Sequence, residues 1–143
     1  MTLKSTRIFV DTAAWLALAN KNDLLHRPAV ELHQELLSSG IYYVTTDYVL
    51  TEVANSLARP PHRKPLIRFL EAVFSSKNVT HLTITRERFL RAWQLYKSRH
   101  DKDWGLTDCT SFVIMEEHHL REAFTSDRHF QQAGYTCLLK SRE

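Results

Sequence analysis

Short runs of strand-forming residues alternate with longer helical patterns along the chain. Ile8, Phe9 and Val10 form the first run, and three consecutive apolar residues predict a short strand buried on both faces. Residues 12–19 follow at once and have helical composition. Further strand-like runs, each next to a helical pattern, occur at residues 41–45, 79–84, 123–126 and 135–139. This order of elements predicts an α/β sandwich around a mainly parallel sheet.

The chain has the size and composition of one globular domain, residues 1–143. It is long enough to bury a core, and its 43% hydrophobic and 24% charged residues are ordinary for a globular protein. No stretch approaches the ~20 apolar residues of a transmembrane helix, and the start of the chain lacks the apolar segment of a signal peptide. Cys109 and Cys137 have no metal-binding spacing and are expected to be small buried residues. We therefore expect a cytoplasmic protein without membrane contact.

Acidic residues stand where an α/β fold gathers ligands. Asp11 directly follows the first predicted strand and Asp127 follows the run at 123–126, and the carboxyl ends of parallel strands meet at one edge of the sheet. Glu52 belongs to the helical pattern after the second strand, and Asp108 opens the apolar run CTSFVIM. Helix capping is the alternative role, because an Asp side chain can bind free backbone N–H groups at a helix start.

If these four acids meet in one crevice, a cation has to neutralise them. Like charges at short distance repel and raise each other's pKa. Oxygen ligands without paired His or Cys favour Mg²⁺ or Mn²⁺, and such ions activate water and stabilise a phosphate under attack. The four acids therefore predict metal-dependent phosphodiester hydrolysis.

The stretch DKDWGLTDC at residues 101–109 carries three of the acids of this chain. Asp101 and Asp103 precede Asp108, and Gly105 is expected to loosen the backbone between them. Thr107 or Asp108 is expected to cap the following helix.

The preceding helical pattern carries large apolar side chains. These side chains are Phe89, Leu90, Trp93 and Tyr96. We expect them to form core rather than a platform on which RNA bases stack.

Four segments resemble the motifs of PIN-domain proteins. They are VDT at residues 10–12, TEVAN at 51–55, DWGLTDC at 103–109 and TSDRHF at 125–130. The resemblance covers nearly the whole chain and is nearest to the small free-standing members, which include VapC-type toxins of toxin–antitoxin pairs. It implies a three-layer α/β/α sandwich and an endoribonuclease that depends on Mg²⁺ or Mn²⁺.

The resemblance also implies roles for individual residues. The residues that would bind metal and carry catalysis are Asp11, Glu52, Asp108 and Asp127. The residues that would support them are Thr12, Asn55, Asp103 and Ser126. Asp103 would lie behind the ligands or hold a second metal, whereas Asp101 is expected to be structural. Gly105 departs from the family, in which Ser is common at this position.

Basic residues provide a candidate RNA surface. The formal net charge is +3 and the pI is about 9.0, which permits a polyanionic partner. The residues expected to bind RNA phosphates are Arg59, Arg63, Lys64, Lys97, Arg99, Lys102 and Arg128. By the same resemblance the partners are RNA, a cognate antitoxin and a second copy in a homodimer. Two alternatives stay open: an RNA- or protein-binding module without catalysis, in which the acids only cap helices, and a structure-specific DNA nuclease.

Overall fold

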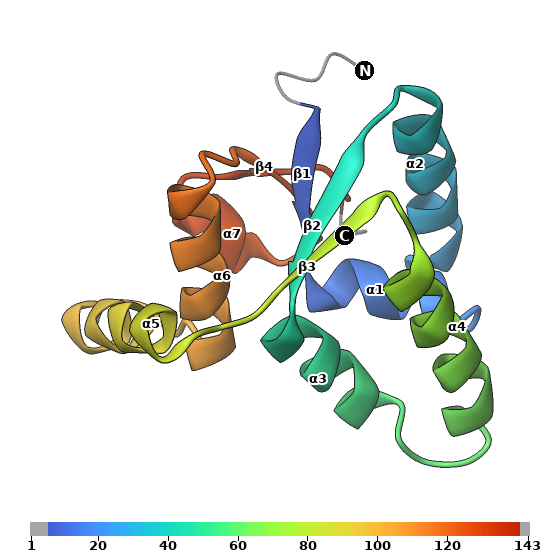
Figure 1. Cartoon of the computed structure of the whole chain (residues 1–143), viewed down its shortest axis with the longest axis horizontal. Helices are drawn as coiled ribbons and strands as arrows, with labels where there is room; N and C mark the ends of the chain where they lie inside the picture. The colour runs from blue at the N-terminus through green and yellow to red at the C-terminus, as the bar shows by residue number, and fades with distance from the viewer. Residues whose placement is uncertain (1–5, 141–143) are drawn as a thin grey trace.

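A parallel sheet forms the centre of the molecule (Figure 1). The computed structural model describes residues 6–140, and within them the strands are β1 (Arg7–Val10), β2 (Tyr42–Thr46), β3 (Val79–Leu82), β4 (Glu122–Phe124) and β5 (Thr136–Cys137). The strand order is β3-β2-β1-β4-β5, and every neighbouring pair is parallel. The predicted α/β fold with its parallel sheet is confirmed.

Helices cover both sides of this sheet. They are α1 (Thr12–Ala19), α2 (His26–Ser38), α3 (Asp47–Ser56), α4 (Arg63–Ser75), α5 (Arg86–Ser98), α6 (Leu106–Glu117) and α7 (Arg128–Gln132). Figure 1 shows α2 and α4 on one side of the strands and α6 and α7 on the other. The helices thus complete the three layers of the predicted sandwich. Among the described residues no helix is long and apolar enough to span a membrane.

The central strand β1 supplies the middle of the core. Ile8, Phe9 and Val10 are fully buried, because β1 has a strand on each side and helices on each face. The ring of Phe9 lies 6.1 Å from that of Phe130 in α7. Both cysteines are free; Cys109 is buried and Cys137 is partly buried. The sequence predicts that the start of the chain lacks a signal peptide, and residues 1–5 of that region lie outside the described residues.

A buried polar chain fixes the end of β1. The indole Nε1 of Trp15 donates to the hydroxyl of Thr45 over 3.1 Å, and that hydroxyl donates to the carbonyl of Val10 over 3.0 Å. Thr45 is fully buried, so no water replaces these bonds. Val10 directly precedes Asp11. These hydrogen bonds from Trp15 of α1 and Thr45 of β2 therefore hold the backbone next to the first predicted acid.

Helix α5 differs from the prediction. Leu90, Trp93 and Tyr96 are 45%, 39% and 44% exposed rather than buried in the core. The reason is the position of α5 at the periphery, where it packs mainly on α6 (Figure 1). Only Ala92 of this helix is fully buried, and Phe89 packs at 6.5 Å on Tyr48 of α3. The prediction that these side chains form core was wrong for three of the four.

The substitution Thr45→Val tests the polar chain. It keeps the shape of the side chain but leaves the Trp15 N–H and one Val10 carbonyl lone pair without a partner, so we expect a loss of about 1–3 kcal/mol in the free energy of unfolding. Urea denaturation measures it. Thr80→Val on the exposed strand β3 is the matched control. A loss no larger than that of the control would contradict the structural role of Thr45.

Candidate metal centre

Asp11 lies at the carboxyl end of the central strand and is almost completely buried, with 4% of its surface exposed. It occupies the N-cap position of α1, but its side chain makes no capping hydrogen bond. Instead, its Oδ2 accepts a bond of 3.1 Å from the hydroxyl of Thr125. Capping therefore does not explain why this carboxylate is in the interior.

Asp108 reaches the same region from the first turn of α6. That helix begins at Leu106 with Gly105 as its N-cap, so the prediction that Thr107 or Asp108 occupies the cap was wrong by two or three residues. The Oδ2 of Asp108 accepts the backbone N–H of Gly105 over 3.0 Å. Asp108 thus stabilises the helix start from within and still directs its carboxylate to the centre.

Gly105 has an ordinary extended backbone, with φ of −74°, so the loosening expected at this glycine is not needed. A Cβ here would lie 3.7 Å from Oδ2 of Asp108, which is normal van der Waals contact. The structure therefore has room for the Ser that is common in the family. The glycine leaves the N-cap of α6 without a side-chain bond.

Asp127 caps α7 and is tied to Asp11 through Thr125. Its Oδ1 accepts the backbone N–H of His129 over 2.9 Å. Its own N–H donates over 3.0 Å to the Thr125 hydroxyl, the group that donates to Asp11. Sequence reasoning missed Thr125, although it stands at the end of the fourth strand-like run, beside the edge where ligands were expected.

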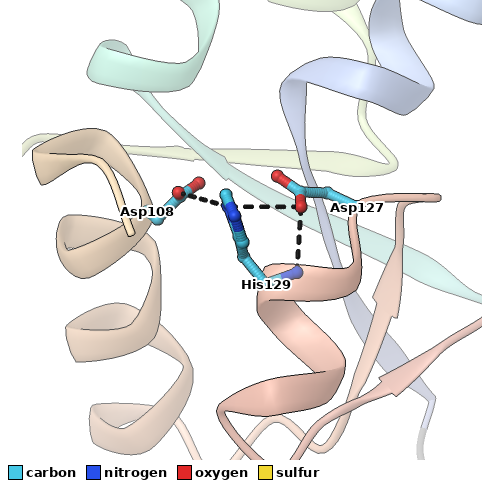
Figure 2. A group of neighbouring side chains, drawn as sticks. All are labelled: Asp108, Asp127 and His129. Atoms are coloured by element: carbon cyan, nitrogen blue, oxygen red, sulfur yellow. Dashed lines mark hydrogen bonds and ion pairs between the residues drawn. The ribbon is translucent and has the colours of Figure 1, made fainter. Parts of the chain in front are cut away.

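His129 contacts three acids, Asp103 and Asp108 of the segment 103–109 and Asp127 of its own segment. Figure 2 shows its ring between Asp108 and Asp127. Its Nδ1 lies 3.1 Å from Oδ2 of Asp108 and 3.3 Å from Oδ1 of Asp127, and its Nε2 lies 3.2 Å from Oδ1 of Asp103. Ligand atoms of Asp108, Asp127 and His129 all lie within 4.8 Å of one another. Sequence reasoning gave His129 no role; its place two residues after Asp127 was the available signal.

The electrostatics of the centre show too little positive charge. Burial, together with the charges of Asp108 and Asp127, raises the pKa of Asp11 to about 7, although hydrogen bonds from the Thr12 amide and the Thr125 hydroxyl lower it in part. Burial and the charge of Asp127 also raise the pKa of Asp108, against the Gly105 amide and His129. A bound cation would stabilise the ionised form of these mutually repelling carboxylates.

The donor set fits a divalent cation. Carboxylate oxygens of Asp11, Asp108 and Asp127 are hard ligands of the kind that Mg²⁺ and Mn²⁺ prefer. The hydroxyl of Thr12, beside Asp11, is buried and has no hydrogen-bond partner among the described residues. A buried hydroxyl of this kind normally binds something, which here would be an ion or its water.

Other predicted residues lie apart from this cluster. Glu52 is exposed on α3, and its carboxylate makes no hydrogen bond or ion pair within residues 6–140; Asn55 is exposed on the same helix. Since α3 packs on α1 and α6, Glu52 is nevertheless carried by a helix that adjoins the centre. Ser126 lines a separate cavity of about 210 Å³ together with Arg128. Asp101 pairs with Arg99.

The predicted basic residues divide into groups. Arg99 and Lys102 line a cavity with Asp103, and Arg128 lies at the cavity of Ser126. Arg59, Arg63 and Lys64 belong to the connection between α3 and α4 and to the start of α4. Figure 1 shows this connection well away from α6 and α7. Those three residues do not flank the acidic cluster.

The sequence and the fold are similar to those of known proteins. The family model of the PIN domain matches residues 8–134. The 23S rRNA-specific endonuclease VapC20 of Mycobacterium tuberculosis, strains CDC 1551 / Oshkosh and H37Rv, is 30% identical over 129 residues, which covers 90% of this chain and 95% of the relative.

Solved structures show the same fold. The crystal structure of M. tuberculosis VapC20, described as a sarcin–ricin loop cleaving toxin, superposes with a TM-score of 0.79 at 27% identity and covers 90% of this chain and 96% of that one. VapBC2 from Rickettsia felis, bound to a promoter DNA fragment, superposes with a TM-score of 0.66 at 12% identity and covers 92% of this chain and 96% of that one. The second likeness concerns the fold alone.

The raised pKa of Asp11 predicts a pH dependence of stability. Because the folded protein holds this proton up to about pH 7 while an unfolded Asp loses it near pH 4, metal-free stability should fall as the pH rises through this window. Asp11→Asn should reduce that fall, leaving the part that comes from the raised pKa of Asp108, and should stabilise the metal-free protein at pH 8 by roughly 2–4 kcal/mol. Urea denaturation at pH 5 and pH 8 in EDTA measures it, with Glu71→Gln as the surface control. Equal slopes in wild type and Asp11→Asn would contradict the assignment.

Proposed function

This chain belongs to the PIN-domain family, and from that premise we propose that it is a divalent-metal-dependent endoribonuclease that cuts ribosomal RNA as the toxin of a toxin–antitoxin pair. The observation that carries the proposal is the cluster formed by the buried Asp11 and the partly buried Asp108 and Asp127 at the carboxyl edge of the sheet, whose negative charges are only partly compensated. The substrate class follows the 30% identical relative, which is named for its action on 23S rRNA.

Asp11, Asp108 and Asp127 would hold the metal, Mg²⁺ or Mn²⁺. A bound divalent cation supplies charge stabilisation at the phosphate and an acidified water. The chain contributes the fixed positions of the ligands: Thr125 holds Asp11, the Gly105 amide holds Asp108 and the His129 amide holds Asp127. Such preorganisation lets the site act without rearranging its own dipoles.

Three further residues are assigned to this site. Thr12 would bind a metal-coordinated water with its free hydroxyl. Glu52 would approach from α3 as a fourth acid, since no contact within the described residues holds its carboxylate elsewhere, and Asn55 lies one turn further along the same helix.

The alternative of a binding module without catalysis has less support. In that case the acids would serve as caps, yet Asp11 makes no cap and its burial costs stability without one. A DNA nuclease would use the same acids, but the named activity of the similar relatives concerns RNA. An antitoxin partner, a homodimer and a cytoplasmic location belong to the proposal, since a ribosome-directed toxin needs an inhibitor in the same compartment.

The substitution Asp108→Asn tests the catalytic assignment. The amide keeps the oxygen that accepts the Gly105 N–H but lacks the charge for the metal, so we expect RNA cleavage to fall by more than about 100-fold with the fold intact. Cleavage of purified 23S rRNA, with sites mapped by primer extension, measures it. Glu31→Gln, an exposed acid on α2, is the control. Cuts by Asp108→Asn at the wild-type rate would overturn the proposal.

Metal removal tests the cofactor independently. Dialysis against EDTA should abolish cleavage, and Mg²⁺ or Mn²⁺ should restore it. The same ions should raise the stability of the wild type, by about 2.7 kcal/mol at a concentration 100 times the Kd. Asp11→Asn should lose most of this stabilisation, as measured by thermal denaturation. Full activity in EDTA would exclude the metal mechanism.

A further inference from the structure

The cavity that Arg99, Lys102 and Asp103 line adjoins the metal centre. It has a volume of about 280 Å³ and is lined by Tyr96, Arg99, His100, Lys102, Asp103, Trp104 and Cys109. These residues come from the end of α5, the segment that follows it and the first turn of α6. Asp103 connects the cavity to the centre, because its Oδ1 lies 3.2 Å from Nε2 of His129. The size is at the small end for ligand sites and suits one flat ring system rather than a larger molecule.

The planar guanidinium of Arg99 forms one wall of the cavity. The guanidinium of Arg99 lies 5.0 Å from the centre of the Trp104 ring, and it donates to both oxygens of Asp101 over 3.0 and 3.1 Å. Trp104 is itself anchored: it is 6% exposed and its Nε1 donates to Oε1 of Gln132 over 3.1 Å. Arg99 therefore contacts both Trp104 and Asp101 without a ligand present.

An exposed aromatic ring stands beside this wall. Tyr96 is 44% exposed, and the ring of Trp93, 5.6 Å away at 17°, stacks on it. Splayed RNA bases bind by stacking on aromatic rings and on Arg guanidinium planes, and Tyr96 and Arg99 offer one of each.

The charges favour a base over a phosphate. Arg99 and Lys102 both pair with Asp101, at 3.0 and 4.0 Å, and Asp103 adds a second carboxylate at the cavity wall, so that two negative charges face two positive ones. A phosphate would meet this carboxylate and little net positive charge. A nucleobase would instead find flat stacking surfaces together with polar groups of Asp103, His100 and Lys102 for its edge.

We propose that this cavity binds one unpaired nucleobase of the RNA substrate, stacked between Tyr96 and Arg99, next to the phosphodiester cleaved at the metal centre. The proposal rests on the proposed function for the identity of the substrate. It gives this face of the enzyme a role in choosing the cleavage site, because a base must be splayed out to enter.

A double-mutant cycle tests the cavity by binding alone. The probes are 2′-O-methyl RNA hairpins with the sarcin–ricin loop sequence, which the enzyme cannot cleave. One hairpin is intact, and each of the others lacks the base at a different position of the loop. At one position, loss of the base should weaken wild-type binding about 5- to 100-fold, as expected for one stacked base. Tyr96→Ala should weaken the intact hairpin similarly and be insensitive to the abasic change at that position. Fluorescence anisotropy gives the dissociation constants.

Matched variants separate stacking from other effects. Tyr96→Phe should bind as wild type, and so should Phe74→Ala, which removes an exposed aromatic side chain from α4. Arg99→Lys should lose affinity although it keeps the charge, because an ammonium group cannot stack. Retained affinity in Arg99→Lys would identify a phosphate contact and overturn the proposal.

Additive losses at every abasic position, or unchanged RNA binding by Tyr96→Ala, would also overturn it. The cleavage assay with wild-type protein is independent of these measurements. Failure to cut RNA would remove the proposed function, whereas failure of the cycle with cleavage intact would remove only the base-binding cavity.

Discussion

The burial of the Asp11 carboxylate at the carboxyl end of the central strand is the constraint on which the site depends. A carboxylate in this position loses its hydration and faces the charges of Asp108 and Asp127, which is why its pKa rises to about 7. The fold accepts this cost without using the side chain as a cap. A divalent cation bound by these carboxylates would offset their repulsion and their lost hydration.

Small polar contacts give the acids their positions. The Thr45 hydroxyl holds the carbonyl before Asp11, and the Thr125 hydroxyl binds both the Asp11 carboxylate and the Asp127 amide. His129 extends the same network to Asp108 and Asp103. Through Asp103 the network reaches the cavity lined by Tyr96 and Arg99, so that the metal centre and the proposed base site share the Asp103 carboxylate.

Local sequence patterns predicted the helices and strands correctly, but they predicted the wrong burial for three side chains of α5. Each strand and helix expected from the periodicity is present, because buried strands and amphipathic helices differ in the spacing of apolar residues. Leu90, Trp93 and Tyr96 have helical spacing too, but spacing does not tell whether another element covers that face. In α5 these three side chains stay exposed, because the helix packs on α6 with its other side. Capping was likewise ambiguous, since Asp108 both binds the Gly105 amide and faces the other acids.

The sequence by itself determined the order of elements, the parallel sheet and the family, because apolar periodicity and the motifs around Asp11, Asp108 and Asp127 are local properties of the chain. Only the tertiary structure decided which side chains meet. Thr125 and His129 entered the site, Glu52 stayed on an exposed helix face, and Tyr96 became a surface ring beside Arg99. The physical reason is that contacts between distant segments depend on helix packing and side-chain direction, which no single segment encodes.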